Sequence, residues 1–322
     1  MDFNTNSGKL VSVIIPFYNR VDLLKSSIKS VINQTYKPIE VILVDDFSSE
    51  KFDLRELDKY NSSDFNIKLI RNPRNLGPGL SRETGRLIAK GDYFAYLDSD
   101  DFWHREFLEK LVHSMEKNPI AGMAYSKTLL IRSKGNFLRN KNDKTYDSII
   151  PIIFDMHGRP WATGACVWRR EIVNKIGPWT KSRIWEDYEY DIRAAKINNN
   201  IIHVPEILFY VNMDSKEKIS LVRNTKKMIE DKARSILNIS RQLRNSEFSK
   251  EKEIQERITY FLLTSCATLS DYRSEIQIIN EMFNEFYNWK NRKNYIMNAM
   301  TYVSPARVNS KIFRIIRQQS RN

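Results

Sequence analysis

Four short apolar runs recur along the first hundred residues, with a helical pattern after each. Each run is four to six residues long, which is the length of a buried strand. The runs occupy residues 11–16, 39–44, 67–70 and 93–97. Between them, apolar residues recur at helical spacing, as in residues 21–32 and 80–88. Strands that alternate with helices form a mostly parallel sheet, so we expect an α/β fold with helices flanking the sheet.

Polar clusters follow three of these runs at the point where each predicted strand ends. Residues 16–19 read Pro-Phe-Tyr-Asn, residues 45–46 are aspartates, and residues 98–101 read Asp-Ser-Asp-Asp. Carboxylates this close repel one another unless a cation or solvent offsets their charge. A solvated acidic turn would explain one cluster by itself. Ligands bind at the carboxyl ends of the strands in such sheets, so three clusters at that edge predict a binding cleft.

Composition limits the class of protein and its surroundings. The 322 residues are 41% hydrophobic and 28% charged, which is typical of a globular domain. No apolar run approaches the ~20 residues of a membrane span, and Cys166 and Cys266 stand far apart, so we expect a cytoplasmic protein without disulfides or a zinc site. The net charge of +13 predicts an anionic partner, which is nucleic acid, a phosphorylated substrate or a membrane surface.

The second half of the chain is less regular and becomes helical near its end. The pattern there predicts a strand over residues 121–131, a loop or hairpin over 132–144, a helix over 170–176, a helix opening near 185, strands over 201–204 and 207–211, and helices near 229–237, 258–265 and 276–287. Local signals also predict that Asn19 caps the helix over residues 21–32, and that Gly91 caps the C-terminus of the helix over residues 80–88.

We place a domain boundary in residues 212–220. Residues 1–215 would form the catalytic domain, and residues 216–322 a helical region for acceptor or membrane docking or for oligomerisation. Residues 307–322 form a basic amphipathic pattern, which is typical both of a helix on an anionic membrane and of a solvated helix packed on its own domain.

The polar clusters have the chemistry that a nucleotide-sugar donor requires. Asp46 can accept hydrogen bonds from a base or ribose, and Asp98 and Asp100 can hold a divalent cation that bridges two phosphates. Strand alternation would point both of these carboxylates to the same side and leave Asp101 to steady the loop or cap the next helix.

Two arginines and two further carboxylates complete the candidate site. Arg74 and Arg82, near the loop at residues 75–77, are placed to contact phosphate or base, unless they are solvated surface residues. Glu186 and Asp187 lie among aromatic residues and are candidates for a general base, although Asp187 would equally cap the helix that follows.

Taken in order, the motifs resemble inverting glycosyltransferase family 2, with the GT-A fold, and its non-processive bacterial members. The resemblance covers residues 9–212 and rests on V-S-V-I-I-P-F-Y-N at 11–19, V-D-D-F-S-S at 44–49, N-L-G-P-G-L-S-R at 75–82, A-K-G-D-Y-F-A-Y-L-D-S-D-D at 89–101 and W-E-D at 185–187. It implies a nucleotide-sugar donor and Mn2+ or Mg2+ as cofactor.

The resemblance also implies roles for individual residues. The donor-binding residues would be Pro16, Tyr18, Asp46, Arg74, Gly77, Arg82, Asp98 and Ser99. The metal ligands would be Asp98 and Asp100, and the catalytic base Asp187 with Glu186 beside it. The acceptor side would be formed by Trp161, Thr163 and Gly164.

Two departures from the family pattern shape the prediction. The chain has no Q-x-x-R-W motif after Asp187, which favours transfer of a single sugar. Residues 208–214 read L-F-Y-V-N-M-D where many relatives carry an Arg and then a His, so the third metal ligand stays open, with Asp214 as a substitute.

We therefore predict a metal-dependent inverting glycosyltransferase in surface polysaccharide synthesis, such as O-antigen or capsule. Asp46 fits uracil best among family members, which favours a UDP-sugar donor. A lipid-diphosphate-linked glycan acceptor and peripheral contact with the inner face of the cytoplasmic membrane would suit the positive charge.

Two other classes of protein share some of these sequence features. A sugar-nucleotide nucleotidyltransferase would need a glycine-rich basic loop after the first strand, and residues 16–19 are not one. A nucleic-acid-binding protein would need basic residues interleaved with aromatic ones, and no such run occurs, so we expect no nucleic acid partner.

Overall fold

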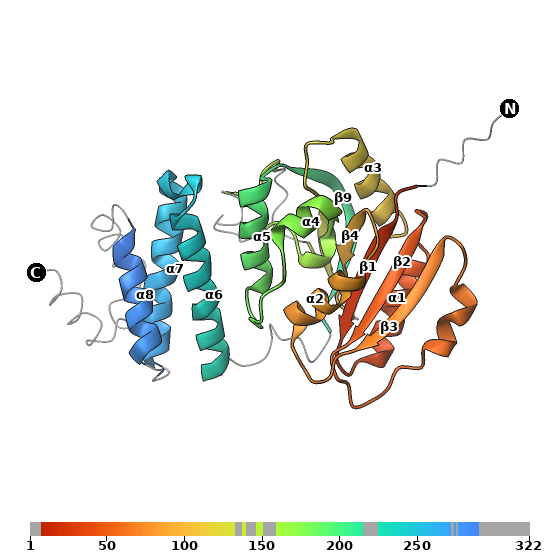
Figure 1. The fold of residues 1–322 in the computed structure, drawn as a ribbon, viewed down its shortest axis with the longest axis horizontal. Helices are drawn as coiled ribbons and strands as arrows, with labels where there is room; N and C mark the ends of the chain where they lie inside the picture. Colours follow the sequence, from red (N-terminus) through yellow and green to blue (C-terminus); the bar gives the residue numbers. More distant parts are fainter. Residues whose placement is uncertain are drawn as a thin grey trace, which may run out of the picture. The chain divides into compact units, whose positions relative to one another are not determined.

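The computed structural model describes residues 8–132, 137–139, 146–150, 159–214, 225–271, 274 and 276–289. Internal contacts divide the chain into two compact units (Figure 1). The first unit comprises residues 1–181 and 193–221, and the second comprises residues 182–192 and 222–322.

Nine strands of the described residues form one mixed sheet in the first unit, in the order β3-β2-β1-β4-β8-β6-β9-β5, with β7 paired to β6. They are β1 (Val11–Phe17), β2 (Ile39–Asp45), β3 (Phe65–Arg71), β4 (Tyr93–Tyr96), β5 (Phe102–Trp103), β6 (Met123–Ile131), β7 (Phe137–Arg139), β8 (Cys166–Arg169) and β9 (Ile201–Asn212). Neighbours among β3, β2, β1 and β4 are parallel, as are β6 and β9, whereas β8 is antiparallel to β4 and β6. The predicted mostly parallel α/β sheet is confirmed.

Helices cover this sheet on both faces (Figure 1). They are α1 (Val21–Ile32), α2 (Pro78–Ile88), α3 (Phe107–Lys117) and α4 (Arg170–Ile176), with short 3-10 turns η1 (Leu54–Tyr60) and η3 (Thr163–Ala165). Helix α5 (Glu186–Ile197) begins in the second unit, and its last residues are counted with the first. Helix α1 connects β1 to β2, which lies on one side of β1. Helix α2 connects β3 to β4, so this connection runs across the sheet in the opposite direction. Because parallel crossovers are right-handed, α1 and α2 lie on opposite faces.

Two glycines permit close packing around β1. A Cβ atom on Gly85 of α2 would lie 2.5 Å from Cγ2 of Ile14, so this glycine lets the helix approach the strand. Gly91 donates its N–H to Oγ of Ser12 at 2.7 Å, and a Cβ there would collide with the Ser12 backbone nitrogen. The prediction that Gly91 caps a helix is wrong, because Ala89 is the C-terminal cap of α2.

Two details of the strands differ from the predicted pattern, and one open alternative is decided. The two strands predicted near the end of the sheet are one strand, β9, whose pairing with β6 shifts register around Lys127. The two-residue strand β5 was not predicted, and it pairs antiparallel with β9. Of the two alternatives for residues 132–144, the described part favours the hairpin, because β7 pairs antiparallel with β6.

Among the described residues of the second unit, the helices α6 (Lys226–Arg244), α7 (Lys252–Asp271) and α8 (Ile276–Asn288) contact one another, and the 3-10 turn η5 (Glu247–Lys250) precedes α7. Thr225 caps α6 by accepting the N–H of Met228 at 3.3 Å. Buried Glu285 accepts from Oγ of Ser240 at 2.9 Å and pairs with Arg244 at 3.1 Å, so a polar cluster joins α6 to α8. None of the helices in the described residues could span a membrane. The predicted amphipathic helix at 307–322 lies outside the described residues.

Candidate active site

The three polar clusters meet at one edge of the sheet, as predicted. Phe17 of β1 lies opposite Asp45 of β2, and the N–H of Asp46 donates to the Phe17 carbonyl at 2.8 Å. On the other side of β1, the N–H of Leu97 donates to the Ile14 carbonyl at 3.0 Å, which brings the acidic segment after β4 to the same edge.

The backbone at this edge is strained after β1 and β2. At this edge, Asn19, Arg20 and Phe47 have positive φ values of 50°, 117° and 70°. Such values are uncommon for residues with a side chain and gather at functional sites. The prediction that Asn19 caps α1 is wrong, because Arg20 occupies the cap position and Oδ1 of Asn19 instead accepts the N–H of Ser49 at 2.8 Å.

The two predicted metal ligands are each paired with an arginine. Nη2 of Arg82 donates to Oδ1 of Asp98 at 2.8 Å, and Nη1 of Arg20 donates to Oδ2 of Asp100 at 3.1 Å. The Asp98 side chain is 41% exposed and that of Asp100 is 8% exposed. The prediction that strand alternation points Asp98 and Asp100 to the same side is wrong, because β4 ends at Tyr96 and the acidic residues form a turn.

Asp101 fastens this acidic turn on two sides. Oγ of Ser27 in α1 donates to the Asp101 carbonyl at 2.6 Å, and the N–H of Asn212 at the end of β9 donates to Oδ1 of Asp101 at 3.1 Å. Asp101 is buried. It therefore steadies the loop, which is the first of its two predicted roles.

Arg82 is a buried cation at the site, not the solvated arginine that was its alternative. Its side chain is 4% exposed, and its guanidinium carbon lies 5.0 Å from the ring centroid of Trp179. That ring in turn makes an edge contact with Tyr96 at 5.1 Å. Packing against these rings fixes the guanidinium where it faces Asp98. Arg74, by contrast, is exposed.

Asp46 organises the loop that precedes α2. Its carboxylate is buried and accepts hydrogen bonds from Nδ2 of Asn72 at 2.9 Å and from the N–H groups of Leu76 and Gly77, both at 2.8 Å. Gly77 has φ 90°, a conformation that favours glycine. The contact of Asp46 with a base stays a prediction.

Residues at the end of β1 and in the acidic turn differ in exposure. Pro16 and Ser99 are buried, whereas Tyr18 is exposed. Tyr18 therefore has side-chain surface available for a ligand.

The predicted acceptor residues pack within the first unit. Trp161 is buried, and its ring lies 5.0 Å from that of Tyr125. The Gly164 carbonyl accepts from Nε1 of Trp103 at 2.6 Å, and a Cβ on Gly164 would lie 2.6 Å from the Phe209 ring. Thr163 is half-buried. These contacts give Trp161 and Gly164 a packing function, and their contact with an acceptor stays a prediction.

Glu186 and Asp187 open helix α5 in the second unit. Trp185, just before them, has φ 61°, and its ring stacks on Tyr188 at 4.8 Å and contacts the edge of Phe261 at 5.1 Å. Glu186 is buried and Asp187 is half-buried. Because a bulky residue rarely adopts this conformation, the strained Trp185 marks this helix start as a functional candidate.

No third ligand joins the two carboxylates within the described part of the chain, where no group of three His, Cys, Asp or Glu side chains could hold a metal. Asp214, the predicted substitute, is exposed, and its N–H donates to Oδ1 of Asn212 at 3.1 Å. His203 stacks on Tyr125 at 4.7 Å, as expected of a packed strand residue.

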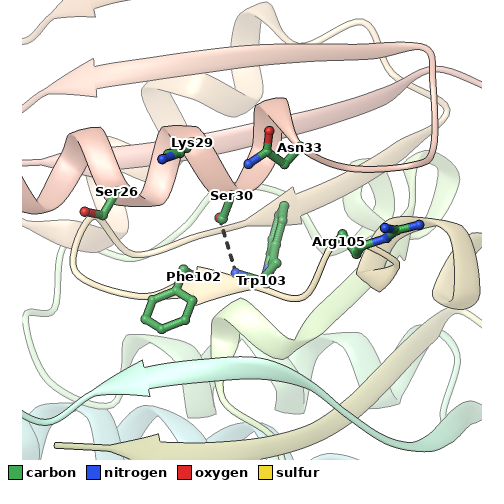
Figure 2. A pocket seen from close by; sticks show the side chains of 7 residues that line it. All are labelled: Ser26, Lys29, Ser30, Asn33, Phe102, Trp103 and Arg105. Carbon is green, nitrogen blue, oxygen red and sulfur yellow. Dashed lines mark hydrogen bonds between the residues drawn. The ribbon is translucent and has the colours of Figure 1, made fainter. Parts of the chain in front are cut away.

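A groove of about 450 Å³ lies between α1 and β5, just beyond the acidic turn (Figure 2). The N–H of Trp103 donates to Oγ of Ser30 across its floor at 3.2 Å. Its lining residues are Ser26, Lys29, Ser30, Asn33, Phe102, Trp103 and Arg105. The groove was not predicted, because it depends on β5.

Two residues of the site were also missed, Arg20 and Phe47. Each lies within two residues of a predicted site residue, Tyr18 or Asp46. Their place next to the polar clusters that follow the predicted strands was a signal that could have identified them.

Comparison with known proteins identifies the family. Residues 12–177 match the sequence pattern described as "Glycosyl transferase family 2". The chain belongs to glycosyl transferase family 2. Among its family 2 relatives, the Escherichia coli protein named UDP-Glc:alpha-D-GlcNAc-diphosphoundecaprenol beta-1,3-glucosyltransferase WfgD is 40% identical over 114 residues, which are 35% of this chain and 44% of that protein. The first curated relatives are matched over 19% to 48% of their length, so the chain spans less than half of each.

Solved structures show that this family 2 chain has the GT-A fold. Residues 1–349 of S. aureus TarS in complex with UDP-GlcNAc align with a TM-score of 0.64 at 18% identity, covering 91% of each chain. The mannosyltransferase PcManGT from Pyrobaculum calidifontis, in complex with GDP-Man and Mn2+, aligns with a TM-score of 0.54 at 15% identity, covering 90% of this chain and 86% of that one.

Proposed function

We propose that the protein transfers one sugar from a nucleotide-sugar donor to a hydroxyl of a glycan acceptor, with inversion at the anomeric carbon. The observation that carries the proposal is the cluster at the strand ends of a family 2 chain, where Asp98 and Asp100 face Arg82 and Arg20. Carboxylates and arginines this close supply groups for a cation and for a diphosphate together.

The donor set suits a hard divalent cation, Mn2+ or Mg2+. Asp98 and Asp100 offer carboxylate oxygens, and Mg2+ is commonly held by one or two carboxylates together with substrate phosphates, so a third protein ligand is not required. When bound, the ion would neutralise charge on the departing nucleoside diphosphate. The Mn2+ in the PcManGT complex supports this assignment.

The arginines and the Asp46 loop would position the donor. Trp179 fixes the Arg82 side chain in the folded protein, so little further side-chain entropy would be lost when Arg82 binds a diphosphate. Asp46 holds the backbone of Leu76 and Gly77 in place next to the start of α2, where helix N–H groups favour anions.

Asp187 is proposed as the general base, with Glu186 beside it. The Asp187 carboxylate would take the proton of the acceptor hydroxyl. The oxygen of that hydroxyl would attack the anomeric carbon as the bond between the sugar and the diphosphate breaks. Inversion requires only this one base, on the side of the sugar opposite the leaving group.

A UDP-sugar and a lipid-diphosphate-linked acceptor are the proposed substrates, in the synthesis of a surface polysaccharide. The name of WfgD, with UDP-Glc and a diphosphoundecaprenol acceptor, and the TarS complex with UDP-GlcNAc support them. The net charge of +13 supports contact with an anionic membrane surface at which such an acceptor would lie.

A ligand panel followed by two substitutions tests the proposal. UDP, GDP, dTDP and their sugars are compared by thermal shift with and without Mn2+, and UDP with Mn2+ should raise the unfolding midpoint most. Asp100→Asn and Asp187→Asn should each abolish transfer while the protein stays folded by circular dichroism. Asp53→Asn changes an exposed aspartate at η1 and is the control. Retained turnover in Asp100→Asn would contradict the role of the acidic turn. Retained turnover in Asp187→Asn would contradict the choice of Asp187 as the base.

A further inference from the structure

We propose that the ring of Phe47 is a stacking surface for the nucleobase of the donor, which makes Phe47 a residue that determines nucleotide affinity. The inference rests on the proposed function, because it assumes that a nucleotide binds at the strand ends. Phe47 lies within the V-D-D-F-S-S motif at 44–49 but was not among the predicted donor-binding residues.

Phe47 is held in a conformation that its bulk disfavours. It has φ 70°, and the residue is 49% exposed, although it follows the buried residue Asp46 directly. A bulky residue in the left-handed region is a structural outlier that persists only where the surroundings enforce it. Here the adjacent N–H of Ser48 donates to Oδ1 of Asp45 at 2.7 Å, which fixes the turn. The turn therefore presents an apolar ring to solvent at a backbone cost.

Arg71 supports the ring from one side. Its guanidinium carbon lies 5.2 Å from the ring centroid of Phe47. The guanidinium is itself held by Oδ2 of Asp45 and by the Ser48 carbonyl, both at 2.7 Å. A cation over one face steadies the ring without burying the residue, which stays exposed for a second flat partner.

The position of the ring indicates what that partner is. Phe47 follows β2 at the carboxyl edge of the sheet, where ligands bind in folds of this kind. Tyr18, which is 47% exposed, leaves the neighbouring strand β1 at the same edge, because Phe17 and Asp45 are in register. Phe47 has no polar group to contribute, so its contact must be with a flat apolar face. Every nucleobase has such a face, and stacking on aromatic side chains is a general means of binding one.

Tyr60 provides a matched control. It is also an exposed aromatic residue with a cation over its ring, since Nζ of Lys59 lies 5.1 Å from the centroid. It lies in η1, before the start of β3, and so belongs to the opposite end of the parallel strands. It shares exposure and cation contact with Phe47 but not the position at the carboxyl edge.

The test compares nucleotide binding and stability in the same variants. UDP binding is measured by calorimetry in the presence of Mn2+, and thermal unfolding is followed for wild type, Phe47→Gly, Phe47→Leu, Phe47→Tyr and Tyr60→Ala. Phe47→Gly should weaken UDP binding about tenfold, because stacking is lost. Its unfolding midpoint should equal or exceed that of wild type, because glycine tolerates positive φ. Phe47→Leu should also bind weakly, whereas Phe47→Tyr and Tyr60→Ala should bind like wild type.

A second probe separates the base from the diphosphate. Inorganic pyrophosphate with Mn2+ carries no base, so its binding should be the same in wild type and Phe47→Gly. If wild type binds UDP and Phe47→Gly binds it equally well, the inference is overturned and the proposed function stands. A lower unfolding midpoint for Phe47→Gly with unchanged UDP binding would likewise make Phe47 a packing residue. If wild type binds none of UDP, GDP and dTDP, the proposed function and the inference fail together.

Discussion

Nη1 of Arg20 donates to Oδ2 of Asp100 at 3.1 Å from a backbone position in the left-handed region, φ 117° and ψ 38°. The pair joins the end of β1 to the acidic turn after β4. It also means that an arginine already contacts Asp100, as Arg82 contacts Asp98, so a cation held by these carboxylates must share or replace the guanidinium groups.

Removal of Arg20 should therefore strengthen cation binding to the nucleotide-free protein. Arg20→Ala leaves the Asp100 carboxylate without this positive neighbour, and Mn2+ should bind roughly fivefold tighter, as expected for the loss of one nearby like charge. Free Mn2+ measured by electron paramagnetic resonance checks this. Arg55→Ala removes an exposed arginine that pairs with Asp53 at 2.7 Å and should leave binding unchanged. Weaker Mn2+ binding in Arg20→Ala would show that the arginine supports the site instead of competing for it.

The Asp46 carboxylate should matter more for the order of its loop than for the stability of the sheet. Asp46→Asn replaces an oxygen that accepts from Gly77 or Leu76 with an amide that cannot, which costs about 1–3 kcal/mol locally. Hydrogen exchange at the Leu76 and Gly77 amides should become faster, and UDP affinity should fall with it. Unchanged exchange at both amides would remove the assigned function of Asp46 in the loop.

The contact between α2 and β1 should be intolerant of one added methyl group. In Gly85→Ala the new Cβ would lie 2.5 Å from Cγ2 of Ile14, so the free energy of unfolding should fall by about 1–3 kcal/mol. Urea denaturation measures this. Gly122→Ala places a Cβ no closer than 3.3 Å to its neighbours and should cost less. Ile14→Ala makes room at the contact, so the loss in the double variant with Gly85→Ala should be smaller than the sum of the single losses, and strict additivity would contradict this packing.

His203 should make the protein less stable as the pH falls. Burial, with a smaller effect of the Lys127 charge, lowers the pKa of His203 to about 4 from its usual 6.5. Above pH 6.5 neither state is protonated, and between pH 6.5 and 4 only the unfolded chain takes up the proton, so the free energy of unfolding falls over that range. Wild type should lose more stability than His203→Gln between pH 7 and pH 4.5 in urea denaturation. Equal losses would mean that the imidazole does not titrate in this way.

Most strands of the sheet could be predicted from the sequence, because local patterns mark each strand and helix along the chain. The apolar runs gave β1 and β2 to within one residue, and helical spacing gave α4 with its observed ends. Strand β5 could not be found in this way, because two residues form no periodic pattern and their pairing depends on β9, a hundred residues later.

The site was predicted as a set of positions and not as a set of contacts. Parallel strands necessarily bring Tyr18, Asp46 and Asp98 to one edge, so their proximity follows from the fold. The pairing of Arg20 with Asp100 joins residues 80 positions apart and depends on a strained backbone, which no propensity indicates. Gly91 is a further contact that the sequence does not reveal. Its local signal predicts a helix cap, but a glycine is needed there because a Cβ would collide with the backbone of Ser12.

The double attachment of Asp101 has a thermodynamic consequence for ligand binding. Because Ser27 and Asn212 hold this residue from α1 and β9, the acidic turn loses its freedom when the chain folds and not when a ligand arrives. Ligand binding at this turn should therefore cost little conformational entropy for ordering the loop. The backbone of the acidic turn should change little when the ligand binds.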